Sequence, residues 1–195
     1  DLWYGSWLYC ADRSCWKQGA VTAMENVRIQ VLKGDVTERS TDAIVNPINT
    51  MLILGSGLSG AIKAKGGDAI AGECAHHGTA PIGTAVLTSG GTLKTRYIIH
   101  AVLAEFDGRI TEQNLVDALR ASLRLANRKK LKSIALPHMD LGISPLPEGQ
   151  SARALFREIK NFLDQENRTL ELIEVVLQDI ELLRVYKDAY HHILG

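Results

Sequence analysis

The sequence contains few cysteines, the residues whose disulfides cross-link small secreted proteins. Only three of its 195 residues are cysteines. Cys10, Cys15 and Cys74 do not form a disulfide framework, which favours a cytoplasmic or otherwise intracellular location. No apolar run approaches the roughly 18 residues that a transmembrane helix requires. No basic segment followed by an apolar one opens the chain, so we expect neither a secretory signal nor a membrane partner.

Net charge is also absent, since 22 lysines and arginines balance 22 aspartates and glutamates. Proteins that bind nucleic acid usually carry a basic excess, so this balance argues against nucleic acid as a partner. The hydrophobic content of 46 % is ordinary for a globular protein. A chain of this length buries roughly 70 % of its unfolded surface, which is enough for one domain with its own core.

Complete metal-binding patterns are missing as well. Cys10 and Cys15 are not followed by a second pair, and the cluster of Cys74, His76 and His77 lacks a fourth ligand. Histidines at a helix end interact favourably with the helix dipole without any metal. The sequence therefore predicts neither a metal site nor a cofactor.

Residues 1–23 differ from the rest of the chain. They hold all three tryptophans and show no clear helical or strand period. A well-formed strand pattern begins shortly after Met24. We therefore predict an N-terminal arm or extension over residues 1–23 and one domain over residues 24–195.

From residue 27 onward, strand and helix patterns alternate. Apolar runs predict strands at 27–32, 42–45, 84–88, 96–102, 131–136 and 170–177. Amphipathic or capped segments predict helices at 59–65, 69–75, 112–128, 151–164 and 179–193. About six strands interleaved with about five helices predict an α/β fold whose mixed or mostly parallel sheet is covered on both faces.

Four residues carry local predictions. Pro47 is expected to end the second strand, because proline cannot donate to a β-ladder. Asp68 and Thr111 are expected to cap the helices that follow them. His100 lies inside a strand and is expected to be a core or edge residue that is satisfied by hydrogen bonds.

The chain is organised around residues 42–64. A strand leads to Asn46 and Asn49, which we place at a turn, and then to a glycine-rich loop and the start of a helix. These parts together form an anion site, because unpaired N–H groups and the positive end of the helix point at it. In α/β sheets such sites lie beyond the carboxyl ends of the strands.

The glycine loop also matches a dinucleotide-binding fingerprint by letter, through the spacing Gly55-x-Gly57-x-x-Gly60. In that fingerprint the glycines follow the first strand directly, and an acidic residue ends the next strand. Here nine residues separate the strand from the glycines, and the acidic residue is missing. The spacing therefore does not favour a Rossmann dehydrogenase.

Several blocks of sequence, taken together in their order and spacing, resemble the macro domain. The blocks are Gly34-Asp35-Val36-Thr37, Asp42-Ala43-Ile44-Val45-Asn46-Pro47-Ile48-Asn49, Gly55-Ser56-Gly57-Leu58-Ser59-Gly60-Ala61-Ile62, Gly83-Thr84-Ala85-Val86-Leu87-Thr88-Ser89-Gly90, Tyr97-Ile98-Ile99-His100, and Ala135-Leu136-Pro137 with Gly142-Ile143 and Pro147. The sequence Asn46-Pro47-Ile48-Asn49-Thr50, the Lys65-Gly66-Gly67 that follows it and the stretch 130–135 are most similar to macro domains of the variant histone and its relatives. The resemblance implies a three-layer α/β/α fold with a mixed, mostly parallel sheet of about six strands.

The resemblance also implies that the domain binds ADP-ribose, either free or attached to a protein. Asp35 matches the acid that accepts a hydrogen bond from the adenine amine, and Val36 matches the neighbour whose backbone N–H faces adenine. Asn49 matches the asparagine at the distal ribose. Two loops match those that hold the diphosphate; the first contains Gly55, Ser56, Gly57, Leu58 and Ser59, and the second contains Leu141, Gly142, Ile143 and Ser144.

The residue types suit these roles through their own chemistry. A carboxylate only accepts hydrogen bonds, which fits the exocyclic amine of adenine, and an asparagine can both donate to and accept from ribose hydroxyls. Two glycine-bearing loops offer many backbone donors to a diphosphate without any lysine. This fits the lack of net positive charge.

The first loop departs from the hydrolytic members of the family, in which an aspartate follows the glycines. This chain has Ser59 there, and a serine hydroxyl is not a general base near neutral pH without an activating partner. Ser59 either caps the helix that we expect to begin at Gly60, or takes part in catalysis together with Asn49. We favour the cap.

The second loop departs as well, because Asp140-Leu141 stand where the family has a small hydroxyl pair, and Ser144 stands where it often has an aromatic. An aspartate facing a diphosphate would be repelled by about 1 kcal/mol or more. Asp140 is therefore interpreted as a turn residue that bonds its own loop. The alternative is a relocated acid/base pair of His138 and Asp140, which would make Asp140 catalytic.

Three functions remain open at this stage. The favoured one is a module that binds ADP-ribose or an ADP-ribosylated protein. The second is an enzyme of the same fold that removes ADP-ribose or a terminal phosphate, with Asn49, Ser59 and Asp140 as its candidate catalytic residues. The third is a scaffold that binds no nucleotide, because its second loop is altered. The oligomeric state is not predicted.

Overall fold

The computed structural model describes residues 27–142 and 145–195, so the arm predicted over residues 1–23 lies outside the described residues. Within them, six strands form one sheet in the order β1-β6-β5-β2-β4-β3. The strands are β1 (Arg28–Lys33), β2 (Ala43–Asn49), β3 (Ala85–Ser89), β4 (Tyr97–Ala104), β5 (Ser133–Leu136) and β6 (Leu172–Leu177). The helices are α1 (Gly57–Gly66), α2 (Asp68–His77), α3 (Glu112–Arg128), α4 (Glu148–Gln165) and α5 (Ile180–Leu194), with a short 3-10 helix η2 (Val36–Glu38).

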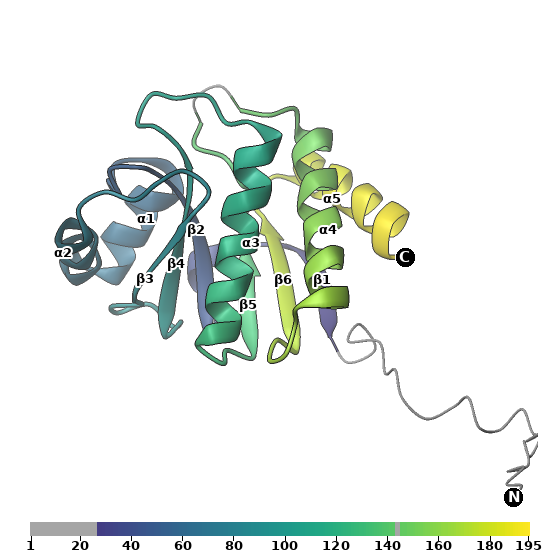
Figure 1. The fold of residues 1–195 in the computed structure, drawn as a ribbon, viewed down its shortest axis with the longest axis horizontal. Coiled ribbons are helices and arrows are strands. Elements are labelled where there is room, and N and C mark those ends of the chain that lie inside the picture. The colour runs from purple at the N-terminus through teal and green to yellow at the C-terminus, as the bar shows by residue number, and fades with distance from the viewer. Residues whose placement is uncertain (1–26, 143–144) are drawn as a thin grey trace, which may run out of the picture.

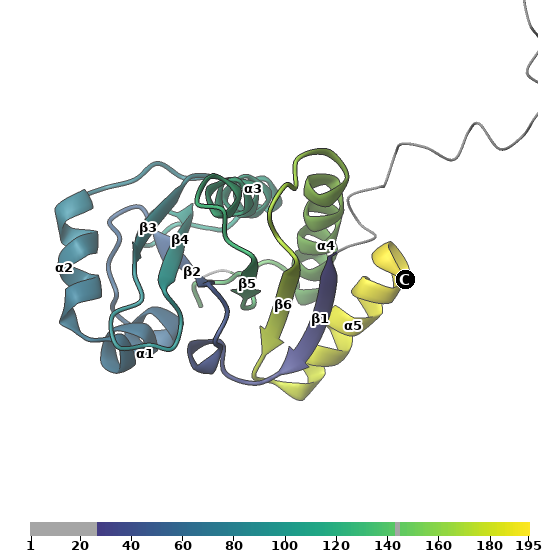
Figure 2. The ribbon, with the colours of Figure 1, turned by 90° about the horizontal axis from the view of Figure 1, so that it is seen from below.

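The sheet is mixed but mostly parallel, because every strand pairing is parallel except that of β3 with β4 at one edge. Helices α3, α4 and α5 pack on one face, and α1 and α2 pack on the other (Figures 1 and 2). The described residues therefore form the predicted three-layer α/β/α fold. None of their helices combines the length and the apolar character that crossing a bilayer requires.

Each strand contributes to two cores, since successive side chains point to opposite faces of a sheet. In β2, Ala43 and Val45 join the core beneath α3, α4 and α5, while Ile44 and Ile48 join the core beneath α1 and α2. The two cores share the same strands, so the layers are not independent units.

The prediction that Pro47 ends the second strand is wrong. Strand β2 continues through Pro47 to Asn49 and pairs with β4 along its whole length. Its pairing with β5 covers only Ala43 and Ile44, so beyond Ile44 that side of β2 has no ladder that would need an N–H from proline. Asn46 is accordingly fully buried inside the strand and does not stand at a turn.

The cap predictions hold only for α3, where the Thr111 side chain accepts a hydrogen bond from the Asn114 N–H at 3.1 Å. Asp68 does not cap α2, because the helix already begins at Asp68 after Gly67. Ser59 does not cap α1 either, because the helix begins at Gly57, and Ser59 lies inside its first turn. Its hydroxyl is instead bonded to the sheet, as described below.

Candidate functional site

Five parallel strands, β1, β6, β5, β2 and β4, have their carboxyl ends at one end of the sheet. Asp35 follows β1, Asn49 ends β2, and the second loop, residues 140–146, follows β5. The structure thus brings the predicted residues to the same end of the sheet. Three strand spacings, or about 14 Å, separate β1 from β2, so Asp35 and Asn49 mark the two ends of an elongated site.

Asp35 is held in place from two sides. Its Oδ1 accepts hydrogen bonds from the Thr37 N–H at 2.9 Å and the Thr37 hydroxyl at 2.7 Å, and its Oδ2 accepts one from Lys65 Nζ at 2.8 Å. Burial alone would raise the pKa of Asp35, but hydrogen bonds from Lys65 and Thr37 outweigh it and keep the pKa below its usual value. Asp35 is therefore an ionised acceptor, and one lone pair of Oδ2 remains for a ligand. Val36, the next residue, is buried.

Asn49 holds the loop that follows β2. Its Oδ1 accepts hydrogen bonds from the Met51 N–H at 3.0 Å and the Ile53 N–H at 3.5 Å. Its amide nitrogen bonds no other residue in the described part of the chain, so its N–H groups are available as donors at the end of the strand.

The first loop exposes backbone at the N-terminus of α1. Gly55, Ser56 and Gly57 are exposed, and Gly57 has a φ of +55°, in the left-handed region that favours glycine. A Cβ at Gly60 would lie 3.2 Å from the Gly55 carbonyl oxygen, so the loop closes directly onto the helix. Leu58 is half-buried and packs on the core beneath α1 and α2. Free N–H groups and the helix dipole make this loop an anion-binding surface without a lysine.

A chain of buried hydrogen bonds lies behind this loop. The Ser59 hydroxyl donates to Asn46 Oδ1 at 3.0 Å, and Asn46 Nδ2 lies 3.1 Å from His100 Nδ1. Asn46 and His100 are register partners on β2 and β4, so their side chains share one face of the sheet. On the other side of the ring, His100 Nε2 lies 2.9 Å from the Thr88 hydroxyl and 3.7 Å from Cys74 Sγ. These contacts link the first turn of α1 to β2, β4, β3 and α2.

The hydrogen bonds also define the tautomer of His100. Burial lowers the pKa of His100 to about 4, so the ring is neutral near pH 7. The Thr88 hydroxyl donates to the Ser89 carbonyl at 3.1 Å and therefore accepts from His100 Nε2–H, which leaves Nδ1 to accept from Asn46. The Ser59 hydroxyl hydrogen then points inward, to Asn46. The prediction of a buried, hydrogen-bonded His100 is confirmed.

Cys74 is a small buried side chain of the core beneath α1 and α2. It is 2 % exposed, and burial raises the pKa of its thiol to about 11. A thiol with such a pKa is protonated near pH 7 and is a poor nucleophile or metal ligand. Among residues 27–142 and 145–195, no three His, Cys, Asp or Glu side chains gather in a metal-binding arrangement.

In the second loop, His138 and Asp140 bond different partners. His138 Nδ1 lies 2.7 Å from the Tyr186 hydroxyl, and burial lowers the His138 pKa although nearby carboxylates act in the opposite direction. Asp140 Oδ1 accepts a hydrogen bond from the Leu141 N–H at 2.6 Å. Asp140 thus bonds its own loop, as a turn residue does, and His138 is partly buried. Within the described part of the loop, the two side chains form no direct hydrogen bond with each other.

The tip of the second loop is described in part. Gly142 has a φ of +73°, again in the left-handed region, so its backbone conformation suits glycine. Leu141 is half-buried and packs on the larger core. Ile143 and Ser144 lie outside the described residues, and their contacts with a ligand stay predictions.

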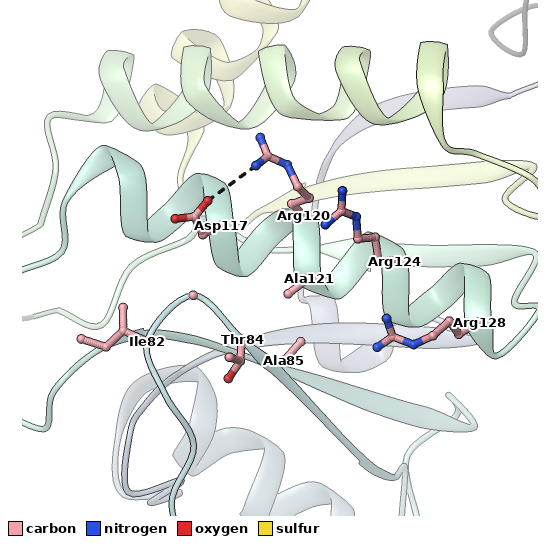
Figure 3. A pocket seen from close by; sticks show the side chains of 9 residues that line it. Ile82, Thr84, Ala85, Asp117, Arg120, Ala121, Arg124 and Arg128 are labelled. Carbon is pink, nitrogen blue, oxygen red and sulfur yellow. Dashed lines mark ion pairs between the residues drawn. The ribbon is translucent and has the colours of Figure 1, made fainter.

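The described surface also has two hollows. One, of about 430 Å³, lies beside α1 and is lined by Gly55, Gly60 and Lys63 among others. The other, of about 480 Å³, lies between α3 and the start of β3 (Figure 3). Neither is lined by Asp35 or Asn49, although the first shares Gly55 with the predicted ligand loop.

Two hydrogen-bond partners in the site were not predicted from the sequence. Lys65 was not expected to bind Asp35, because 30 residues separate them in the chain. Asn46 was assigned to a turn and not to His100. A signal was present, because each of two apolar runs contains one polar residue, and buried polar side chains in neighbouring strands need each other as partners.

Comparisons with known proteins agree on one family. The family model of the Macro domain matches residues 45–155. A macro domain-containing protein of Caldanaerobacter subterraneus subsp. tengcongensis is 36 % identical over 172 residues, which cover 85 % of this chain and 97 % of the relative. A protein of Pantoea vagans named O-acetyl-ADP-ribose deacetylase 1 is 35 % identical over 165 residues, which cover 82 % of this chain and 96 % of the relative. A mutant macrodomain of Oceanobacillus iheyensis, solved with ADPR, has a TM-score of 0.79 at 29 % identity and covers 87 % of this chain and 95 % of that one. The chain belongs to the macro domain family.

Proposed function

We propose that this macro domain binds ADP-ribose, with adenine at Asp35 and the distal ribose at Asn49. One observation carries the proposal. An ionised acceptor follows β1, a loop with a left-handed glycine follows β5, and an asparagine donor ends β2 before the exposed backbone that leads into α1, all at one end of the sheet. The Oceanobacillus iheyensis macrodomain solved with ADPR supports the choice of ligand.

Each part of the ligand finds a matching group in this pose. The remaining lone pair of Asp35 Oδ2 accepts from the adenine amine, beside the Val36 N–H. The diphosphate faces the N-terminus of α1, where N–H groups and the helix dipole favour an anion. The Asn49 amide donates to a ribose hydroxyl, because its oxygen already holds the loop. No lysine is needed at the diphosphate.

We further propose that the ADP-ribose is attached to a protein. Met51, Ile53 and Phe106 are 51 %, 40 % and 54 % exposed, and they lie in the loops that follow β2 and β4. The Thr50 hydroxyl donates to Glu105 at 2.7 Å, which ties these two loops together at the distal-ribose end. An apolar rim in this position suits contact with the protein that carries the ligand.

Calorimetry with ADP-ribose tests the proposal directly. We expect binding in the micromolar range, and tighter binding of an ADP-ribosylated protein than of free ADP-ribose. Met51→Ser combined with Phe106→Ser should remove the difference between the two ligands and leave free ADP-ribose unaffected. No heat at high ligand concentration would refute both the binding module and an ADP-ribose hydrolase, and it would leave the non-binding scaffold.

Asp35→Ala tests the orientation of the ligand. We expect at least about a tenfold loss of affinity, because a hydrogen bond to a charged group contributes roughly 1.5–3 kcal/mol. Glu38→Ala is the matched control, since Glu38 also bonds Lys65, at 2.9 Å, but has no assigned ligand contact. Equal affinities of the Asp35→Ala variant and the wild type would rule out the assigned adenine position.

Hydrolysis of an ADP-ribose derivative is the second candidate function, and the Pantoea vagans relative favours it through its name. Ser59 donates its hydrogen inward to Asn46 and has no basic partner in the described residues, so its hydroxyl is not activated. We therefore propose binding without turnover. Release of ADP-ribose from a modified protein by the wild type would contradict this. A loss of that release in Asp140→Asn would assign catalysis to Asp140.

Two finer predictions accompany this function. The resemblance to variant-histone macro domains stays a prediction. An intracellular location also stays a prediction, based on the scarcity of cysteine.

A further inference from the structure

The hollow between α3 and β3 is lined by none of the residues assigned to ADP-ribose. It has a volume of about 480 Å³ and runs between the start of β3 and one side of α3 (Figure 3). Asp117, Arg120, Ala121, Arg124 and Arg128 line the helix side, and their spacing of three or four residues places them on one helix face. We call this hollow the α3–β3 groove.

The floor of the groove is an open sheet edge, because β3 is the last strand in the sheet order. Thr84 accepts from the Val102 N–H at 3.0 Å, and Gly90 donates to the Arg96 carbonyl at 2.9 Å. In an antiparallel pair such residues alternate, so the N–H and C=O groups of Ala85 and Leu87 point away from β4. Among the described residues no further strand pairs with this edge, and it can therefore accept an added strand.

The far end of the same edge is closed by a side chain. The Ser89 N–H also points outward and donates to Glu73 of α2 at 2.8 Å. At the near end, a Cβ on Gly83 would lie 3.0 Å from the Asp117 Cβ, so the groove is narrow there. Only a short segment fits between these two limits, and it can pair with Ala85 and Leu87.

The charge of the groove favours an acidic occupant. Arg120 and Arg124 form two-bond ion pairs with Glu158 and Glu166, and in Figure 3 their guanidinium groups point away from β3. Arg128 is exposed, and no residue in the described ranges forms a hydrogen bond or an ion pair with it. Figure 3 shows its side chain extending back along the helix toward Ala85. The one unpaired cation of the groove thus lies beside its open strand.

We propose that the α3–β3 groove binds a short extended acidic segment of a partner protein, which adds a strand to β3 and pairs a carboxylate with Arg128. Backbone hydrogen bonds to Ala85 and Leu87 supply the affinity, and Arg128 selects for acidic side chains. None of the residues that line the groove is assigned to ADP-ribose, so the two sites can be tested separately.

A fluorescein-labelled octapeptide of alternating valine and glutamate is the probe, with alternating valine and lysine as its counterpart. Fluorescence anisotropy with the full chain should show at least tenfold tighter binding of the acidic peptide. Arg128→Glu should weaken that binding about tenfold or more. Lys129→Glu, the same charge change one residue away and outside the groove lining, should change it less than about twofold.

Ala85→Pro tests the strand addition itself. It removes an outward N–H from an edge strand, where proline is tolerated, so the fold and ADP-ribose binding should persist while peptide binding falls about tenfold. Strand addition can also be tested without a variant. Adding the acidic peptide to the wild type should change the amide chemical shifts of Ala85 and Leu87. Equal binding of both peptides, unchanged binding by Arg128→Glu, or shifts confined to other residues would overturn the proposal. So would tighter binding of a labelled uridine octamer, because that would identify the groove as an RNA site.

Discussion

His100 and Asn46 stand out at the residue scale, because both are fully buried polar side chains in the middle of the sheet. Both side chains form hydrogen bonds there. The neutral ring accepts from Asn46 and donates to Thr88, so each nitrogen has a partner. Asn46 in turn accepts a hydrogen bond from Ser59, which stands where the resemblance implies an aspartate in hydrolytic members. The Ser59 hydroxyl thus helps to position the loop, and no base among the described residues activates it.

His100 should make the protein sensitive to mild acid. Its folded pKa of about 4 lies below the value near 6.5 of the unfolded chain, so between these pH values only the unfolded state takes up the proton. Stability from this group is complete above pH 6.5 and falls as the pH drops toward 4. Between pH 7 and pH 5 we expect a loss of about 2 kcal/mol.

Urea unfolding of the wild type and of His100→Gln at pH 7 and pH 5 measures this contribution. The variant should be less stable at both values but should lose less on acidification. His138, whose pKa is also lowered, should account for part of the remaining loss. An identical pH dependence of the two proteins would show that His100 does not carry this effect.

At the element scale, the first loop and α1 act as one unit. The loop returns onto the helix so closely that Gly55 and Gly60 are nearly in backbone contact. The hydroxyl of Ser59 fixes the first helical turn to β2. Any side chain that pushes the loop off the helix therefore changes the anion-binding surface before it changes the core.

Gly60→Ala should weaken ADP-ribose binding about threefold to tenfold, because its Cβ would lie 3.2 Å from the Gly55 carbonyl oxygen and the loop must shift. Gly72→Ala, in α2, is the matched control, since its Cβ would meet nothing within 4 Å. The control should leave affinity unchanged and stabilise the protein by roughly 0.5–1 kcal/mol through helix propensity. Calorimetry and thermal unfolding of both variants separate the two effects. Equal affinities would show that the loop is not pressed against the helix.

The elements also show what local patterns can predict. Helix α3 was predicted with its bounds and its cap, because a strong apolar stripe and a threonine at the right place act locally. The prediction that Pro47 ends a strand was wrong because a proline is tolerated in β2 beyond the point where its pairing with β5 stops. No local pattern reveals how far β5 extends. The residues at the sheet end were predicted from the resemblance to the macro domain, whereas Lys65 and Asn46 acquire their roles only when distant segments meet.

At the scale of the whole molecule, the two cores lie on opposite faces of one sheet and share its strands. Neither core can be lost while the other remains, because strands such as β2 supply side chains to both. The proposed ligand contacts extend from β1, at one edge, to β2, near the middle. Binding in this pose would span half the sheet.

ADP-ribose should consequently stabilise the molecule as one unit. At a ligand concentration of about 100 times Kd the gain is about 2.7 kcal/mol, which corresponds to a rise in Tm of roughly 5–10 °C for a domain of this size. Far-UV and near-UV circular dichroism should report one shared transition with and without ligand. Asp35→Ala should show a much smaller rise at the same concentration. Two separate transitions would contradict the shared-sheet argument.

The order of the strands also bears on how the protein is made. In the described sheet, β1 pairs only with β6, which ends at Leu177, and the Gly34 N–H beside Asp35 donates to the Leu177 carbonyl at 2.9 Å. During synthesis, β1 must therefore wait until β6 has emerged. The central strands and the asparagine end of the proposed site can assemble earlier, but the turn that carries Asp35 is fixed only when β6 is in place. A chain that is truncated or stalled before β6 would thus lack the proposed adenine contact even where its centre has folded.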